Sequence, residues 1–291
     1  MNVIGASWFL AARPKTLSAA VVPVLVGTAM TPHSVSIHWP SFTFALIGAI
    51  FIQIGTNLVN DALDFKKGAD TGARLGPTRV TQAGLISAKN VLRGAYVCFL
   101  LAALCGIPLI LRAGWPLLAI GVVSIVAAYA YTGGPYPLAY NGLGEIFVIV
   151  FFGFVAVGGS YFVQTLKLRS DVLVAGFAVG SLAVVLLAIN NLRDIASDRV
   201  SNKRTMAVRL GERFARAEIA FFVLAPFGAL AVIARLRVQW TLLAPFLALP
   251  LVLMLLLRVN RGHGAELNRC LAIAGGAQWL FGILFVIGSI V

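Results

Sequence analysis

Carboxylates, histidines and cysteines are scarce in this chain. Its 291 residues include ten Asp and Glu, three His and three Cys, against 23 Lys and Arg. Cys98, Cys105 and Cys270 lie in apolar stretches without paired spacing, so neither a disulfide framework nor a cysteine-based metal site is implied. The three histidines fall in predicted loops, so a zinc, copper or iron site, which favours His or Cys ligands, is not expected.

Charged residues of either sign are also few, whereas apolar residues are abundant. Hydrophobic residues make up 60% of the chain and charged residues 11%, and the mean hydropathy is +0.94. This composition excludes an ordinary soluble globule and indicates a protein that crosses a membrane several times. No linker or low-complexity segment divides the chain, so we predict a single membrane domain over residues 1–291.

Apolar stretches near 20 residues long predict nine transmembrane helices in an all-α integral membrane protein. The first is the least regular, because its uninterrupted apolar part rises only about 21 Å at 1.5 Å per residue. The nine expected spans are 14–31, 42–63, 90–111, 115–132, 143–164, 171–191, 217–235, 239–257 and 268–290.

Lys and Arg side chains set the predicted orientation of these spans. With the amino end in the cytoplasm, only five of the 23 basic residues fall in outer segments: Arg112, Lys167, Arg169, Arg235 and Arg237. This distribution agrees with the positive-inside rule for nine crossings, amino end inside and carboxyl end outside. The net charge of +13 is therefore largely a topology signal, and we expect no nucleic-acid partner.

Asp and Asn residues form two clusters, each at the end of a long apolar span. The first reads Asn57-Leu-Val-Asn60-Asp61-Ala-Leu-Asp64, and the second reads Asn190-Asn191-Leu-Arg193-Asp194-Ile-Ala-Ser-Asp198. Spacings of three, four and seven residues place oxygen ligands on one helical face. Ionisable residues near a bilayer are a functional hypothesis by default.

Both clusters are predicted at the cytoplasmic, carboxyl-terminal ends of their helices. Carboxylates there face the negative end of the helix dipole, so a bound cation or nearby basic side chains must compensate. Two such faces can hold a hard cation between them. The predicted metal ligands are Asn57, Asn60, Asp61, Asp64, Asn191, Asp194 and Asp198, and the four carboxylates among them, Asp61, Asp64, Asp194 and Asp198, are the predicted catalytic residues.

Basic residues, hydroxyls and glycines follow both clusters. Lys66, Arg74 and Arg79 come after the first, and Lys203 and Arg204 after the second. Mg²⁺ takes a few carboxylates together with phosphate oxygens, and Arg grips phosphate in bidentate fashion. We therefore predict Mg²⁺ and a diphosphate substrate. A site within apolar helices implies that the rest of this substrate is apolar, as in a polyprenyl diphosphate.

The two clusters resemble the paired Asp-rich motifs of the UbiA superfamily of intramembrane aromatic prenyltransferases. Other stretches resemble the branch that prenylates 1,4-dihydroxy-2-naphthoate in menaquinone synthesis. They are Ala12-Arg13-Pro14-Lys15-Thr16-Leu17, Asp64-Phe-Lys-Lys-Gly-Ala-Asp70-Thr71, Leu75-Gly-Pro-Thr-Arg79-Val-Thr-Gln82, Tyr131-Thr-Gly-Gly-Pro135 and Lys203-Arg204-Thr205-x-Ala207-Val208-Arg209-Leu210-Gly211.

This resemblance implies a fold, a reaction and a location. The fold is a set of nine helices around a central cavity. The reaction is Mg²⁺-dependent transfer of a polyprenyl group to 1,4-dihydroxy-2-naphthoate with loss of CO₂, which gives a demethylmenaquinone. The location is a bacterial inner membrane, with multiple passes through the lipid and the active site facing the cytoplasm.

Two positions depart from the superfamily pattern. Many members carry a further Asp four residues after Asp64, where this chain has Gly68 and then Asp70. Others carry Tyr-x-x-x-Lys where Tyr131 is followed by Pro135, so other basic residues must grip the diphosphate. These are Arg13, Lys15, Arg79, Lys203 or Arg204.

The loop from Tyr131 to Glu145 contains no Lys or Arg, and its end at 142–145 resembles the naphthoate branch. We therefore expect Tyr131 and Glu145 near the acceptor. The complete set of predicted substrate-binding residues is Arg13, Lys15, Lys66, Arg74, Arg79, Tyr131, Glu145, Lys203 and Arg204.

Alternatives remain at this point. The acceptor could be another aromatic compound, such as 4-hydroxybenzoate, or the donor could carry a phytyl group. An ion-coupled membrane transporter would use the clusters as coupling-ion sites, although such sites usually lie near the bilayer midplane rather than at helix ends. Tyr131, Tyr136 and Tyr140 could also belong to an interfacial aromatic belt.

Overall fold

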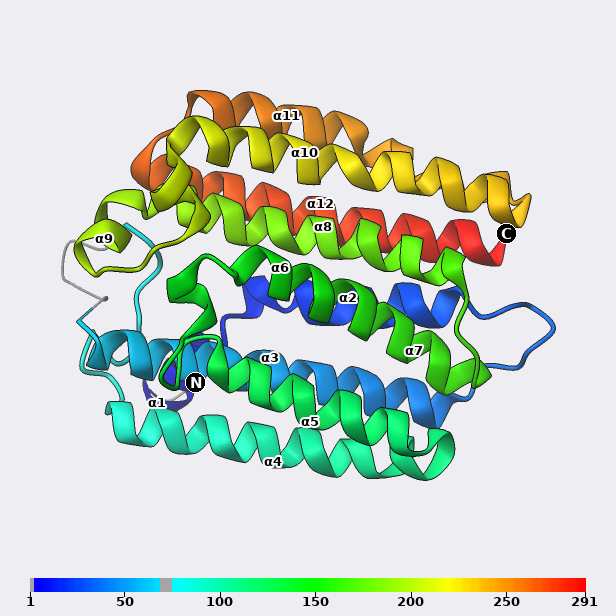
Figure 1. Ribbon diagram of the computed structural model, residues 1–291, viewed down its shortest axis with the longest axis horizontal. Helices are drawn as coiled ribbons and strands as arrows, with labels where there is room; N and C mark the ends of the chain where they lie inside the picture. The colour runs from blue at the N-terminus through cyan, green and yellow to red at the C-terminus, as the bar shows by residue number, and fades with distance from the viewer. Residues whose placement is uncertain (1–2, 69–74) are drawn as a thin grey trace.

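The computed structural model describes residues 3–68 and 75–291 of the chain. Every regular element in these ranges is helical, as Figure 1 shows, which confirms the predicted all-α class. Arg74, a predicted substrate-binding residue, and Asp70 lie outside the described residues.

The regular elements follow one another along the chain, and the longest connection, residues 67–87, joins α3 to α4. In chain order they are α1 (Val3–Ala12), η1 (Pro14–Thr16), α2 (Ser18–Ala29), α3 (Trp39–Lys66), α4 (Ala88–Ala113), α5 (Trp115–Ala130), η2 (Leu138–Asn141), α6 (Gly144–Val148), η3 (Ile149–Val155), α7 (Ala156–Thr165), α8 (Ser170–Arg193), α9 (Ile195–Val200), α10 (Met206–Arg237), η4 (Trp240–Ala248), α11 (Leu249–Arg261), η5 (Gly264–Glu266) and α12 (Leu267–Ile290).

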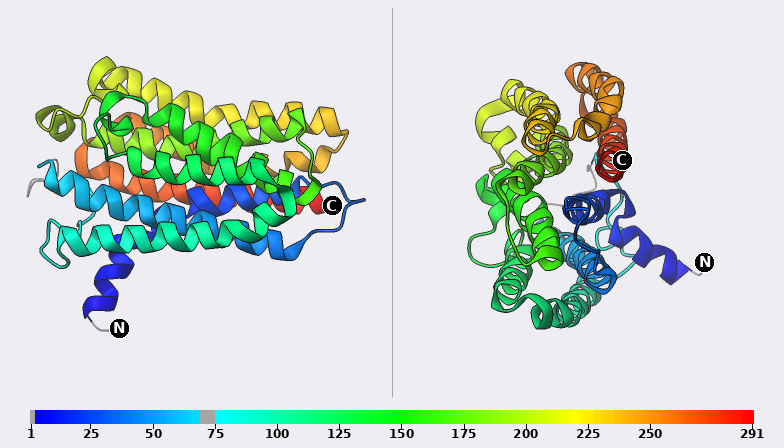
Figure 2. Two further views of the ribbon diagram at one scale, coloured as in Figure 1. Left: turned by 60° about the horizontal axis from the view of Figure 1, so that its bottom comes forward. Right: turned by 90° about the vertical axis from the view of Figure 1, so that its right-hand side faces the viewer.

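The long helices lie side by side in two groups with a middle layer between them (Figures 1 and 2). One group consists of α3, α4 and α5, and the other of α8, α10, η4–α11 and α12. The middle layer is formed by α2 and by the segment α6–η3–α7, which touch both groups. Helix α1 projects sideways from the bundle. The carboxyl ends of α3 and α8, which carry the two clusters, lie at the same end of the bundle.

A helix lies at each of the nine predicted spans, but the count of nine is not confirmed. Within the described ranges, seven helices are long and apolar enough to cross a membrane. A pair bent by 51°, residues 5–16 and 18–29, raises the number to eight. The remaining predicted span is α5, whose 16 residues rise about 24 Å at 1.5 Å per residue, short of a hydrocarbon core of about 30 Å.

The predicted span 143–164 is an interrupted helix. Its centre, η3, is a π-helix between the α-helices α6 and α7. Glycines allow η3 to pack tightly on α8, because a Cβ atom built on Gly153 would lie 2.5 Å from the carbonyl oxygen of Gly176. A π-helical turn shifts the register of the side chains that follow it, and such turns are frequent at functional sites. Here η3 places Phe151, Phe152 and Val155 in the wall of the cavity described below.

Candidate active site

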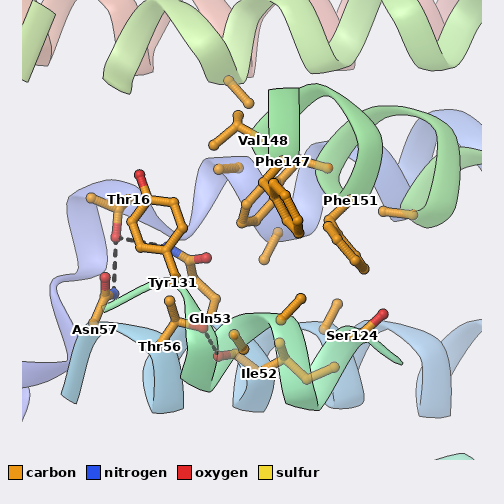
Figure 3. A pocket seen from close by; sticks show the side chains of 18 of the residues that line it. Thr16, Ile52, Gln53, Thr56, Asn57, Ser124, Tyr131, Phe147, Val148 and Phe151 are labelled. Atoms are coloured by element: carbon orange, nitrogen blue, oxygen red, sulfur yellow. Dashed lines mark hydrogen bonds between the residues drawn. The ribbon is translucent and has the colours of Figure 1, made fainter. Parts of the chain in front are cut away.

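A cavity of about 380 Å³ lies between α2, α3, α4, α5, the segment α6–η3–α7 and α8. Its wall is apolar over most of its length. Figure 3 shows Thr16, Asn57 and Tyr131 on one side of it and the stacked rings of Phe147 and Phe151 on another. The charged and amide side chains of its wall are Arg13, Gln53, Asn57, Asn60, Asp64, Arg79, Asn190, Asn191, Arg193, Asp194 and Lys203. The two clusters, distant in sequence, thus face one cavity.

Asp64, in the first cluster, is held by two donors. Arg79 Nη2 lies 2.9 Å from its Oδ2, and the Tyr140 hydroxyl donates to its Oδ1 at 2.9 Å. Arg79 Nη1 also donates to the main-chain oxygen of Asn60 at 2.7 Å. The Asp64 and Arg79 side chains are only 6% and 8% exposed, so this ion pair is shielded from water. Arg79 therefore folds its loop back onto the carboxyl end of α3.

Asp61 is buried but does not line the cavity. Its Oδ2 accepts the main-chain N–H of Val80 at 3.2 Å, and its Oδ1 accepts that of Thr81 at 3.1 Å. Asp61 therefore shapes the loop that presents Arg79. Its role as a metal ligand and catalytic residue stays a prediction, and the hydrogen bonds to the loop give it a structural role as well.

Asp194, in the second cluster, is held by its neighbour in the chain. Arg193 Nε and Nη2 donate to its two carboxylate oxygens at 2.8 and 2.6 Å, and Arg193 Nη1 donates to Asn268 Oδ1 at 2.8 Å. The amide of Asn268, on α12, in turn donates to the main-chain oxygen of Leu75 at 2.8 Å. A chain of hydrogen bonds thus runs from Asp194 to the loop that carries Arg79.

Asp198 is the most distant carboxylate of the second cluster and lies on the short helix α9. Lys203 Nζ lies 3.8 Å from Asp198 Oδ1, and the main-chain N–H of Lys203 donates to the Asp198 carbonyl at 2.8 Å. Lys203 lines the cavity, whereas Asp198 does not. Asp198 therefore places a basic side chain in the cavity wall.

Tyr140 joins the surroundings of the two clusters, and sequence reasoning missed this role. Its hydroxyl binds Asp64, while Lys67 Nζ and Lys203 Nζ lie 4.4 and 5.7 Å from its ring centroid, within range of cation–π attraction. Lys67 also donates to the Thr132 carbonyl at 2.5 Å. Partial burial lowers the pKa of the Lys67 ammonium, more than the nearby Asp64 carboxylate raises that pKa. The sequence places Tyr140 among several loop tyrosines and gives no signal that separates it from Tyr136.

The asparagines of the clusters have fixed amide groups. Asn57 Nδ2 donates to the Ala12 carbonyl at 3.0 Å. It also donates to Thr16 Oγ1 at 3.1 Å, as Figure 3 shows. Asn60 Oδ1 accepts the Thr132 hydroxyl. Asn191 Nδ2 donates to Glu145 Oε1 at 2.8 Å.

The structure distributes the predicted substrate-binding residues unevenly. Arg13, Arg79, Tyr131 and Lys203 line the cavity. Lys15, Lys66 and Arg204 are exposed and lie outside its wall. Glu145 is also outside the wall and contacts Asn191, and its expected position near the acceptor stays a prediction.

The donor set fits a hard cation that also binds phosphate. Among the described residues, no three His, Cys, Asp or Glu side chains are close enough to form a metal site by themselves. The cavity wall nevertheless offers oxygens from Asn57, Asp64, Asn191 and Asp194. Mg²⁺ usually binds one or two carboxylates and completes its shell with phosphate oxygens and water. These residues therefore fit Mg²⁺ in the presence of a diphosphate.

Comparison with known proteins agrees with this geometry. The model of the UbiA prenyltransferase family matches residues 20–282. The chain belongs to this family. A 1,4-dihydroxy-2-naphthoate octaprenyltransferase of Mycobacterium tuberculosis is 38% identical over 90% of this chain and 88% of its own length. A 1,4-dihydroxy-2-naphthoate octaprenyltransferase of Haemophilus influenzae is 35% identical over 98% of this chain and 96% of its own length.

Solved structures of the family share this fold. A UbiA homologue from Archaeoglobus fulgidus, bound to GPP and Mg²⁺, superposes with a TM-score of 0.69 over 98% of this chain and all of its own. The two sequences are 14% identical. The structural likeness therefore establishes the fold alone. The roles of individual residues have to be argued from this chain.

Substitution of Tyr140 tests its contact with Asp64. Tyr140→Phe removes the hydroxyl donor and keeps the ring beside Lys67 and Lys203. Because a hydrogen bond to a charged group contributes about 1.5 kcal/mol, we expect kcat/KM for prenyl transfer to fall about tenfold. Tyr136→Phe, which changes an exposed tyrosine of the same loop, is the matched control and should leave the rate unchanged. Equal rates for the two variants would contradict the assignment.

Proposed function

We propose that this enzyme transfers a polyprenyl group from polyprenyl diphosphate to 1,4-dihydroxy-2-naphthoate. Diphosphate leaves the donor, the ring carboxylate is released as CO₂, and the product keeps both ring hydroxyls, so it is demethylmenaquinol, the reduced form of a demethylmenaquinone. The observation that carries the proposal is one cavity with two Asp/Asn clusters and several basic side chains at one end and an apolar wall beyond. This arrangement matches a substrate with an anionic head and an apolar tail. The names of the relatives described above support the naphthoate acceptor.

The diphosphate binds at the end of the cavity formed by the two clusters. Asn57, Asp64, Asn191 and Asp194 would hold Mg²⁺, and Asn60, Asp61 and Asp198 complete the predicted set. When bound, Mg²⁺ neutralises charge that develops on the leaving diphosphate. Arg79 and Lys203, in the cavity wall, supply further positive charge at the same place. Such preorganised charge lowers the barrier because it stabilises the leaving group most strongly in the transition state.

The apolar wall holds the prenyl chain and protects the reaction. Phe147, Phe151 and Phe152 face the cavity from the interrupted span. Departure of the diphosphate leaves an allylic cation, which water would trap. A wall without water lets the electron-rich naphthoate ring attack the cation first. The new bond forms at the ring carbon that carries the carboxylate. Loss of CO₂ from this carbon follows, and the electrons of the broken C–C bond restore the aromatic ring.

The acceptor ring is bound beside Tyr131. This side chain lines the cavity between the two clusters and the apolar wall. The loop that follows Tyr131 contains no Lys or Arg up to Glu145, so selection depends on the shape of the slot more than on charge pairing.

The distribution of basic residues supports a cytoplasmic active site. The chain acts as one membrane domain over residues 1–291. Its basic residues are concentrated at the end of the bundle that carries the clusters, which favours a cytoplasmic position for that end. The proposed location is a bacterial inner membrane, where both the apolar donor and the product reside.

Neutralisation of either cluster tests the role of the carboxylates in diphosphate departure. We expect Asp64→Asn and Asp194→Asn each to lower kcat by at least about 10²-fold, because each removes a ligand and leaves an arginine without its partner. EDTA should abolish wild-type activity and Mg²⁺ should restore it. Glu212→Gln, at an exposed ion pair on α10, controls for loss of a carboxylate elsewhere. A variant of either cluster with wild-type turnover at limiting Mg²⁺ would refute this role.

Product analysis tests the acceptor. Purified protein in lipid is incubated with a polyprenyl diphosphate, Mg²⁺ and either 1,4-dihydroxy-2-naphthoate or 4-hydroxybenzoate, and the lipids are analysed by mass spectrometry. We expect a decarboxylated naphthoate product, with CO₂ released in equal amount, and no detectable prenylated 4-hydroxybenzoate. Prenylated 4-hydroxybenzoate as the main product, or a naphthoate product that retains its carboxylate, would overturn the choice of acceptor.

A further inference from the structure

Glu145 is a buried carboxylate that the proposed reaction does not use. It lies in the first turn of α6, is 7% exposed and does not line the cavity. Its Oε1 accepts a hydrogen bond of 2.8 Å from Asn191 Nδ2. Asn191 lines the cavity and belongs to the second cluster. Glu145 therefore contacts the site through Asn191.

The direction of this hydrogen bond fixes the side-chain amide of Asn191. An amide group has a donor end, NH₂, and an acceptor end, the carbonyl oxygen, whereas a carboxylate only accepts. Glu145 thus selects the rotamer in which Nδ2 points toward α6. The opposite end, Oδ1, makes no hydrogen bond within the described part of the chain. It is the end that remains for a ligand in the cavity.

The first cluster contains the same arrangement with a different acceptor. Asn57 Nδ2 donates to the main-chain oxygen of Ala12 and to Thr16, which leaves Asn57 Oδ1 without a hydrogen bond within the described residues. Both asparagines thus have a bound NH₂ group and an available oxygen. In the first cluster the amide of Asn57 is oriented by a main-chain oxygen, that of Ala12. In the second cluster the amide of Asn191 is oriented by the Glu145 side chain, which can be replaced by mutation.

We propose that Glu145 is a positioning residue, which orients the Asn191 amide so that its oxygen, and not its NH₂ group, faces the metal–diphosphate site. This inference rests on the proposed function, since that function supplies the ligand. An NH₂ group in the same place would repel a cation and could not coordinate it. Partners that orient a metal ligand affect metal affinity without touching the metal.

The backbone around Glu145 leaves little freedom for a different arrangement. A Cβ atom built on Gly144 would lie 3.0 Å from Leu187 Cδ2 and 3.1 Å from the Tyr131 hydroxyl. The start of α6 is therefore packed between α8 and the cavity wall. This packing holds the Glu145 carboxylate against Asn191 on α8.

Exchange of the two functional groups tests the proposal. In Glu145→Gln the new amide can donate as well as accept, so Asn191 can turn its NH₂ group toward the cavity. In Asn191→Asp the new carboxylate lies against that of Glu145, and neither can donate a hydrogen bond to the other. In the double variant Glu145→Gln/Asn191→Asp the pair keeps its net charge, Gln donates to one Asp oxygen, and the other oxygen faces the cavity. The double variant therefore restores an oxygen ligand that each single variant disturbs.

The readout is metal binding rather than turnover. Mn²⁺ binding is measured by electron paramagnetic resonance on the whole protein in detergent, with an unreactive prenyl thiolodiphosphate. Each single variant should weaken Mn²⁺ binding about 10- to 100-fold, as loss of an orienting partner does. Because residues in contact are not additive, the double variant should recover to within about threefold of the wild type. Glu212→Gln, at an exposed ion pair on α10, is the control and should bind Mn²⁺ normally.

The outcomes separate this inference from the proposed function. Undisturbed Mn²⁺ binding in Glu145→Gln, or a double variant no better than the weaker single variant, overturns the positioning role while the wild type still binds metal and transfers prenyl groups. If Glu145 only stabilised the fold, all three variants would have lower thermal stability. The double variant would then not recover Mn²⁺ binding. Wild-type protein that binds no Mn²⁺ with the analogue would instead contradict the proposed function, and the inference with it.

Discussion

Compensation of negative charge at the carboxyl ends of α3 and α8 is the constraint on which the site depends. The last turns of both helices expose carbonyl oxygens, and both carry carboxylates in addition. Buried charges of this kind are tolerated only when they are paired and hydrogen-bonded. Arg79 serves Asp64 and Arg193 serves Asp194, both through short contacts. These two pairs then determine where the neighbouring segments lie, because Arg79 fixes its loop on α3 and Arg193 is bound to α12 through Asn268.

The same pairs prepare the site for an anionic substrate and a cation. A carboxylate oxygen has two lone pairs, so Asp64 and Asp194 can keep a hydrogen bond from arginine and still coordinate a metal ion. Diphosphate adds negative charge and the metal ion adds positive charge. The net charge near Arg79 and Arg193 therefore changes little when both bind together. Cooperative binding of metal and diphosphate is the expected consequence, since either one alone disturbs the compensation.

The sequence predicts the general plan of this site better than its detail. Hydropathy and residue spacing predict the helical class, because both are local properties of the sequence. The predicted ends of the spans also place Asp64 and Asp194 on the same side of the membrane, and the structure shows both in the wall of one cavity. Hydropathy and spacing do not predict that α6–α7 is interrupted by a π-helix, which depends on the close approach of Gly153 to α8. The hydrogen-bond partners of Asp61, Glu145 and Tyr140 are not predicted for a related reason. The partner of each side chain lies in a distant segment, and one sequence does not show which segment that is.

Direct location of the metal relative to both clusters tests the central claim, namely that α3 and α8 jointly hold the diphosphate through a cation. The measurement is a structure of the protein in lipid with Mn²⁺ and an unreactive prenyl thiolodiphosphate, in which anomalous scattering identifies the metal. The account predicts anomalous density at the cluster end of the cavity, with oxygens of Asp64, Asp194 and the diphosphate as direct ligands. Metal bound at one cluster only, with the diphosphate elsewhere in the cavity, would contradict it.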